Sequence, residues 1–124
     1  MHTGDYRYNY SNPANLIPVL ETFKNLTVIG AHFGGWSVWE DAARRLPRYE
    51  NIYADTSSTA GFKGVEYMKS LLPKYDIDRV LFGSDYPMWD LGAEKDAVIA
   101  LNLPDAQNRK IFSGNCARVY GLDV

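Results

Sequence analysis

Short apolar runs alternate with longer amphipathic segments along this chain. The apolar runs lie at 1–3, 26–31, 51–55 and 79–83. They are too short for helices, and continuous apolar runs of this length are typical of strands buried on both faces of a parallel sheet. The segments between and after them space their apolar residues three and four apart, as helices do; they lie at 14–24, 38–46, 65–72, 94–101 and 106–120. This alternation predicts an α/β fold with parallel strands.

Two of the predicted helices begin at capping residues. Asn12 precedes Pro13, so the first helix has a side-chain cap and a proline in its first turn. Ser37 stands three residues before Glu40, which is the capping-box spacing and predicts that Ser37 caps the second helix. Gly114 marks a candidate break in the last helix.

Each predicted strand ends at a residue able to bind a metal or move a proton, namely His2, His32, Asp55 and Asp85. The intervals of roughly 23 to 30 residues leave room for a loop, a helix and the next strand. The carboxyl ends of parallel strands meet at one edge of the sheet, where folds of this class build their sites. The pattern therefore predicts that these four residues gather at one site.

The two histidines differ in how strongly the sequence supports a chemical role. His32 ends a buried strand and is followed by 33–35 (FGG), whose glycines allow close approach of a backbone or ligand. The alternative is a core histidine satisfied by a carbonyl, and the position at a strand end favours chemistry. His2 alone is as consistent with a frayed terminus, and only the following 3–5 (TGD) supports it.

The two aspartates also admit two interpretations each. Asp85 runs directly into a turn fixed by Pro87, so it either ligates a divalent metal and takes a proton from metal-bound water or caps that turn. Asp55 opens a polar turn, which is its favoured interpretation, and a supporting role behind the site is the alternative. Two histidines with one or two aspartates are ligand types that zinc and manganese accept.

Aromatic and cationic side chains follow the strand ends. Trp36 and Trp89, with Tyr6, Tyr8, Tyr10 and Trp39, either wall a pocket for a planar substrate or pack within the fold. Arg7 either binds a substrate carboxylate bidentately or forms a surface salt bridge.

Composition narrows the class of protein. The formal net charge of -2, without a run of Lys or Arg, disfavours nucleic-acid and anionic-membrane binding. No stretch is long and apolar enough to span a membrane, and the start of the chain lacks the features of a secretory signal. The single cysteine, Cys116, is expected to be a buried, inert thiol, which fits a reducing cytoplasm. We expect one domain over 1–124.

Four segments together resemble the amidohydrolase superfamily. They are 2–5 (HTGD), 30–36 (GAHFGGW), 81–87 (LFGSDYP) and 115–122 (NCARVYGL). They are most similar to the amidohydrolase-related branch that includes aminocarboxymuconate-semialdehyde decarboxylase and resorcylate decarboxylases. The resemblance extends over essentially the whole chain, and the motifs keep the family's order and intervals.

This resemblance implies the C-terminal half, strands five to eight, of a (β/α)8 TIM barrel. It makes His2 a metal ligand and Asp85 a metal ligand that also contacts the metal-bound water. It makes His32 the residue that polarises or deprotonates that water or binds substrate, and it puts Asp55 at the end of strand seven. The implied activity is that of a zinc- or manganese-dependent hydrolase or decarboxylase acting on a small organic molecule.

The family's first-strand His-x-His pair has no counterpart, because His2 and His32 are the only histidines. One chain then offers fewer than the three protein ligands usual at a catalytic zinc. A half barrel also leaves strand edges unpaired. We therefore expect a homodimer that completes the barrel, or a missing N-terminal half. A catalytically incompetent half barrel and a binding or scaffold module that self-associates are the alternatives.

Overall fold

Three short parallel strands form the centre of the fold. In the computed structural model, which describes residues 1–123, they run in the order β1 (Val28–Gly30), β2 (Ile52–Asp55) and β3 (Val80–Leu81). Ile29 is opposite Tyr53, and Ala54 is opposite Val80. The parallel α/β class predicted from the apolar runs is confirmed.

The predicted first strand at 1–3 is wrong as a strand. Only Met1 pairs beside β1, through a bond from its amino group to Ile29 O (2.7 Å) and one from Ala31 N to Met1 O (2.9 Å). The next residues leave the sheet, since Thr3 O accepts from Trp36 N at 2.8 Å and Gly4 has a φ of 87°. His2 is therefore carried by one pair of sheet bonds and by the loop that follows.

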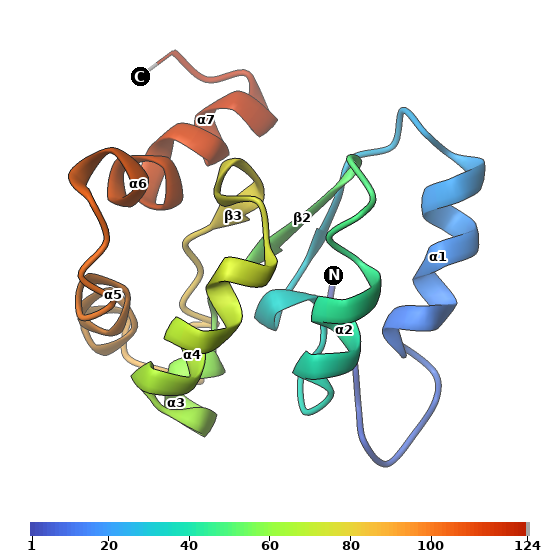
Figure 1. The fold of residues 1–124 in the computed structure, drawn as a ribbon, viewed down its shortest axis with the longest axis horizontal. Helices are drawn as coiled ribbons and strands as arrows, with labels where there is room; N and C mark the ends of the chain where they lie inside the picture. The colour runs from blue at the N-terminus through green and yellow to red at the C-terminus, as the bar shows by residue number, and fades with distance from the viewer. Residues whose placement is uncertain (124) are drawn as a thin grey trace.

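Seven helices surround the strands within residues 1–123. They are α1 (Pro13–Thr22), α2 (Trp39–Arg45), α3 (Thr59–Lys63), α4 (Val65–Leu71), α5 (Leu91–Ile99), α6 (Asp105–Arg109) and α7 (Asn115–Tyr120). Short 3₁₀ turns lie at η1 (His32–Gly34), η2 (Leu72–Lys74) and η3 (Ile77–Arg79). Figure 1 shows α1 and α2 beside β1 and β2, and α5 to α7 on the β3 side.

Two predictions about helix ends have opposite outcomes. The Asn12 cap is confirmed, since its side chain accepts from Ala14 N at 2.9 Å. The Ser37 cap is wrong: α2 begins at Trp39, and Ser37 has a φ of 62°. Its hydroxyl instead accepts from Tyr6 N at 2.8 Å, which ties the loop after His2 to the loop after His32.

The helical pattern also differs from prediction in two segments. Helix α3 lies between the predicted strand at 51–55 and the predicted helix at 65–72, where no helix was predicted. The last helix does not break at Gly114, because a π-helical segment, η4 (Lys110–Gly114), joins α6 to α7.

The core lies between the strands and the helices. One cluster, which includes Phe33, Met68, Val80 and Ile111, links β2 and β3 to α4, α5 and η4. A second cluster joins α1 and α2 to β1 and β2. Both clusters bury the helix-facing side of the sheet, which leaves the strand ends free to carry polar groups.

The outer edge of β3 is occupied by the C-terminal helical segment. The side chain of Asn115, which is fully buried, donates to Val80 O at 2.7 Å and to Ile77 O at 2.8 Å. Phe82 N donates to Ile111 O at 2.8 Å. Backbone groups at this edge are thus satisfied by η4 and α7.

Two smaller sequence expectations are tested by the same structure. Cys116 is partly exposed, so the prediction of a buried thiol is wrong. Among the helices described in residues 1–123, none has the length and apolar character needed to cross a membrane.

Candidate active site

His32 is held in an unusual backbone conformation where β1 ends. His32 and Phe33 have φ values of 59° and 52°, in the left-handed region that residues other than glycine rarely adopt. Each such residue costs about 1–2 kcal/mol. The conformation is fixed from outside the turn, because His32 N donates to Asp55 Oδ1 at 3.0 Å. The end of β2 therefore sets how the ring of His32 leaves the sheet.

The ring of His32 has a partner at each nitrogen. Its Nε2 lies 3.1 Å from His2 Nδ1, and its Nδ1 lies 2.9 Å from Ser57 Oγ and 3.2 Å from Ser57 O. His32 is only 4% exposed. Burial with a partner on both nitrogens fixes the ring in one orientation.

His2 lies on the exposed side of His32. The two rings meet edge to face, with centroids 5.0 Å apart, and His2 Nε2 lies 3.0 Å from Gly4 O. Trp36 stands 6.0 Å from His2, centroid to centroid. The two histidines thus form a pair at the ends of neighbouring chain segments.

Asp55 lies behind His32, binds its backbone N–H directly and reaches its ring through Ser57. Its Oδ1 accepts from His32 N and from Ser57 N, each at 3.0 Å, and also from the Ser57 hydroxyl. The bond to Ser57 N is the local turn that the sequence favoured. Asp55 therefore combines both sequence interpretations: it closes a turn and supports the site.

Four consecutive hydroxyl residues after β2 (Thr56 to Thr59) are all buried. We call this segment the hydroxyl turn. Ser57 contacts His32, and the Ser58 hydroxyl donates to Asp85 Oδ2 at 2.9 Å. Thr59 Oγ1 donates to Ser57 O and accepts from Trp39 Nε1, both at 3.2 Å.

The sequence analysis missed Ser57 and Ser58 as site residues. Buried hydroxyls need hydrogen-bond partners, so an uninterrupted run of four directly after a buried strand was the available signal. Their side chains connect His32 to Asp85 across the ends of β2 and β3.

Asp85 is exposed and has a φ of 57°. The turn that follows is capped by its neighbour, since Tyr86 N donates to Ser84 Oγ at 3.3 Å. The carboxylate of Asp85 instead accepts a hydrogen bond from the Ser58 hydroxyl. Among the described residues, the capping interpretation therefore fits Ser84 and leaves the carboxylate of Asp85 facing the pocket.

A pocket of about 310 Å³ opens in front of these residues. Its lining consists of His2, Asp5, Arg7, His32, Trp36, Phe62, Asp85 and Met88. Both histidines and Asp85, which the sequence placed at three separate strand ends, thus border one space. Its volume suits a small organic molecule.

Arg7 and Asp5 form a two-point ion pair at the pocket wall. Arg7 Nε and Nη2 lie 3.1 and 2.9 Å from the two carboxylate oxygens of Asp5. The hydrogen bonds from Arg7 lower the pKa of the Asp5 carboxyl below its usual value. The rings of Tyr6 and Tyr8 flank the guanidinium at 5.7 and 5.6 Å. The predicted salt bridge of Arg7 is present, at a residue that also lines the pocket.

The tryptophans separate into three environments. Trp36 lines the pocket, and Trp39 is buried in the core. Trp89 lies behind the pocket, against Gly61 and with its ring 5.2 Å from that of Phe62. It therefore supports Phe62, which does line the pocket.

A buried carboxyl stands next to the hydroxyl turn. Glu94, on α5, is 4% exposed, and burial raises the pKa of its carboxyl. A hydrogen bond from the Ser58 backbone lowers this pKa in part, and the charges of Asp85 and Asp55 raise it further. Negative charge is thus concentrated around Ser58.

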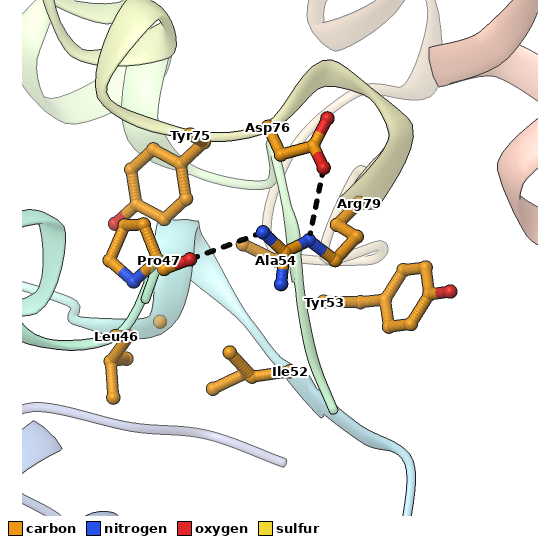
Figure 2. A pocket seen from close by; sticks show the side chains of 9 residues that line it. Leu46, Pro47, Ile52, Tyr53, Ala54, Tyr75, Asp76 and Arg79 are labelled. Carbon is orange, nitrogen blue, oxygen red and sulfur yellow. Dashed lines mark hydrogen bonds and ion pairs between the residues drawn. The ribbon is translucent and has the colours of Figure 1, made fainter. Parts of the chain in front are cut away.

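A second cavity, between β2, the end of α2 and η3, is too small for a substrate (Figure 2). Its volume is about 10 Å³, which is space for one water molecule. Arg79 spans it, with Nη2 donating to Pro47 O at 3.2 Å and Nε 3.4 Å from Asp76 Oδ2. This cavity is a small gap between packed side chains.

Residues 1–122 match the model of a known protein family, described as amidohydrolase. The chain belongs to the amidohydrolase family. The resemblance inferred from the four sequence motifs is therefore confirmed. A comparison with curated proteins gives no match.

The solved structures that are similar to this amidohydrolase chain are TIM-barrel proteins, and most of them are enzymes. One is an amidohydrolase from Burkholderia multivorans with bound zinc (TM-score 0.74, 14% identity, covering 90% of this chain and 49% of that chain). Another is an uncharacterized TIM-barrel protein from Bordetella bronchiseptica (TM-score 0.74, 26% identity, 98% and 44%). A third is a dihydroxybenzoic acid decarboxylase from Polaromonas sp. JS666 with bound manganese and 2-nitroresorcinol (TM-score 0.69, 18% identity, 90% and 40%).

This chain spans about half the length of the solved structures it matches. Its parallel strands and alternating helices are part of a (β/α)8 barrel, as the sequence predicted. The pocket with His2, His32 and Asp85 lies at the carboxyl ends of the strands, the face on which TIM barrels carry their active sites.

The metal-binding capacity of this amidohydrolase chain is partial. Within residues 1–123, no three His, Cys, Asp or Glu side chains are grouped so that they could hold a metal ion. The nitrogens of His32 already have partners in His2 and Ser57, and Asp85 is bonded to Ser58. The described residues alone therefore do not fit a complete three-ligand site of the kind usual for catalytic zinc.

Proposed function

We propose that this chain carries part of the active site of a metal-dependent hydrolase or decarboxylase that acts on a small organic substrate. The observation that carries the proposal is the linked set His2, His32, Ser57 and Asp55, whose two histidines border the same pocket as Asp85. Zinc in one of the similar solved structures and manganese in another support a divalent metal, with zinc the first candidate.

The roles proposed for the side chains follow from their positions. His32 accepts or delivers a proton at the pocket through Nε2, and His2 and Asp85 offer metal-ligating atoms beside it. Arg7 binds an anionic group of the substrate with the guanidinium N–H groups that Asp5 leaves free. Trp36 forms an apolar wall.

Two candidate site residues from the sequence, Asp55 and Trp89, receive indirect roles in this proposal. Asp55 acts through Ser57 and the backbone of His32, because its bonds run to those groups. Trp89 acts through Phe62, against which it packs.

We also propose that ligands from outside these 124 residues complete the metal site. They come from a second copy of the chain in a homodimer, or from the half of the barrel that this chain does not span. The absence of a three-ligand group within residues 1–123 supports this, as does the greater length of the matched structures. The single cysteine supports a reducing cytoplasmic compartment.

The deciding experiment measures mass and metal content on the same purified sample. Light scattering gives the oligomeric state, and zinc and manganese titrations are made on the wild type, His2→Ala and Asp85→Ala. We expect metal bound in an assembly larger than one chain, and at least about a tenfold loss of affinity in both variants. Asp105→Ala, which removes an exposed carboxylate on α6, is the matched control.

Two outcomes would contradict the proposal. One full equivalent of metal bound by a monomer would refute completion from outside the chain. Absence of metal binding in every assembly state would favour a second candidate, a non-catalytic binding module. The exposed rings of Tyr6, Tyr8 and Tyr10 beside the pocket favour that candidate, and ligand-induced stabilisation that survives both substitutions would identify it.

A further inference from the structure

We infer that Ser57 and Asp55 are positioning residues that hold His32 with its proton on Nδ1 and so present Nε2 to the pocket. The inference takes from the proposed function only the idea that His32 acts at this pocket. It assigns a role to a serine that the sequence pattern did not single out, and it can be tested without turnover.

The hydrogen bond between Ser57 and Asp55 has one possible direction. A carboxylate oxygen accepts hydrogen bonds and has no proton to give. Asp55 Oδ1 is the point at which three donors converge: the backbone N–H groups of His32 and Ser57, and the Ser57 hydroxyl. The hydroxyl proton of Ser57 is therefore directed at Asp55.

The nitrogen of His32 that faces Ser57 is Nδ1. With its proton directed at Asp55, Ser57 Oγ presents lone pairs to His32 Nδ1, 2.9 Å away. The carbonyl oxygen of Ser57, which only accepts, lies 3.2 Å from the same nitrogen. Both groups require a proton on Nδ1. The opposite tautomer would set a nitrogen lone pair against two buried oxygen atoms.

The other ring nitrogen of His32, Nε2, faces His2. In a neutral imidazole with its proton on Nδ1, the lone pair is on Nε2. This nitrogen lies 3.1 Å from His2 Nδ1, at the pocket side of the ring, and accepts a hydrogen bond from it. The other nitrogen of His2 faces the carbonyl oxygen of Gly4 at 3.0 Å, so His2 makes both bonds when each of its ring nitrogens carries a proton. The hydrogen bonds of Ser57 thus select which nitrogen of His32 is basic at the pocket.

The bonds that hold His32 are buried and share one acceptor atom. His32 and Ser57 are 4% and 3% exposed, so water does not compete for these bonds. Asp55 Oδ1 binds both the backbone of His32 and the hydroxyl that contacts its ring. One carboxylate oxygen therefore fixes the strained main chain and the ring together, and this distinguishes the arrangement from an ordinary polar turn.

The test is a nitrogen NMR measurement on the full chain with ¹⁵N-labelled histidine, read where the His32 ring carries a single proton. His2→Gln assigns the two histidines. In the wild type we expect the ¹⁵N shifts of His32 to show a proton on Nδ1 and none on Nε2. A wild-type His32 protonated on Nε2 would overturn the inference directly, with no variant needed.

Variants then separate positioning from folding. In Ser57→Ala and Asp55→Asn we expect the ratio of the Nδ1–H to the Nε2–H form of His32 to fall about tenfold, which corresponds to the loss of one hydrogen bond of ordinary strength. Ser57→Thr keeps the hydroxyl and should keep the ratio. Ser58→Ala is the matched control, because Ser58 is equally buried in the same turn but contacts Asp85.

An unchanged ratio in Ser57→Ala, or an equal change in Ser58→Ala, would refute the role of Ser57. The result is independent of the metal titration described above. A chain that shows the expected tautomer but binds no metal would refute the proposed function and leave this inference intact.

Discussion

His2 and His32 meet edge to face at the pocket, with Nδ1 of the first 3.1 Å from Nε2 of the second, although 30 residues separate them in the sequence. The contact arises because each residue leaves the sheet at the same end of neighbouring parallel segments, with Met1 bonded beside β1. Because the two segments run parallel, residues 30 positions apart in the sequence lie in contact at the same end of the sheet.

Replacing Ser58 with Ala should weaken metal binding by about 10- to 100-fold, the usual effect of removing a group that orients a metal ligand. The Ser58 hydroxyl is the hydrogen-bond donor to Asp85 Oδ2. Competition with a zinc chelator measures the change. Ser113→Ala removes an exposed hydroxyl on η4 and serves as the control. Equal affinity in the two variants would contradict the orienting role.

Replacing Gly4 with Ala should destabilise the fold more than the same change at Gly64. Both glycines have a positive φ, of 87° and 82°, so the conformational cost is similar, about 1–2 kcal/mol. A Cβ at Gly4 would lie 2.5 Å from Trp36 O, whereas nothing lies within 4 Å of a Cβ at Gly64.

The close contact at Gly4 should add about 1–3 kcal/mol to the loss of unfolding free energy. Urea denaturation of both variants measures the difference. If the two variants unfolded at the same urea concentration, the loop after His2 would not be packed against Trp36 as described.

Replacing Asn115 with Ala should cost about 2–4 kcal/mol of unfolding free energy. The side chain is fully buried and donates to Val80 O and Ile77 O, so its loss leaves two carbonyl groups without their donor. Asn9→Ala, at an exposed position, should change stability little. Thermal or urea unfolding measures the stability of both variants. Equal stability of Asn115→Ala and Asn9→Ala would contradict this prediction.

Replacing Glu94 with Gln should stabilise the fold at neutral pH. Burial raises the pKa of Glu94 above its ordinary value of 4.5, so the folded state binds the proton more tightly than the unfolded state does. Stability therefore falls as the pH rises from the ordinary glutamate range through the raised pKa. Glutamine keeps an acceptor for the Ser58 backbone and removes the charge.

The pH dependence provides the control for the Glu94 prediction. Below the ordinary glutamate pKa the carboxyl is protonated in both states, so the advantage of Glu94→Gln should disappear. Urea midpoints of the wild type and the variant at about pH 4 and about pH 8 test this. A constant difference between them would mean that the charge of Glu94 is not the cause.

The parallel sheet was predictable because its signal is local. Apolar runs such as 26–31 cannot form amphipathic helices, and their spacing leaves room for crossover helices. The Asn12 cap was predictable for the same reason, since cap and helix are adjacent. The strand at 1–3 was not, because its length in the sheet depends on where Thr3 and Gly4 turn away toward Trp36.

The candidate site was predictable only in part. The positions of His2, His32 and Asp85 at the ends of predicted parallel strands predicted that they lie at one edge of the sheet. The structure places all three at one pocket. Ser37 satisfied a local capping rule but bonds Tyr6 across the site instead. Ser57 and Ser58 were missed because a polar turn looks the same in sequence whether it faces water or is buried.

The hydrogen bonds that Asn115 and Ile111 make with the edge of β3 already occupy the backbone groups of that edge. An additional strand laid against β3 would compete for Val80 O and Phe82 N, groups that the C-terminal helical segment now occupies. Extension of the sheet on this side would therefore be coupled to displacement of α7.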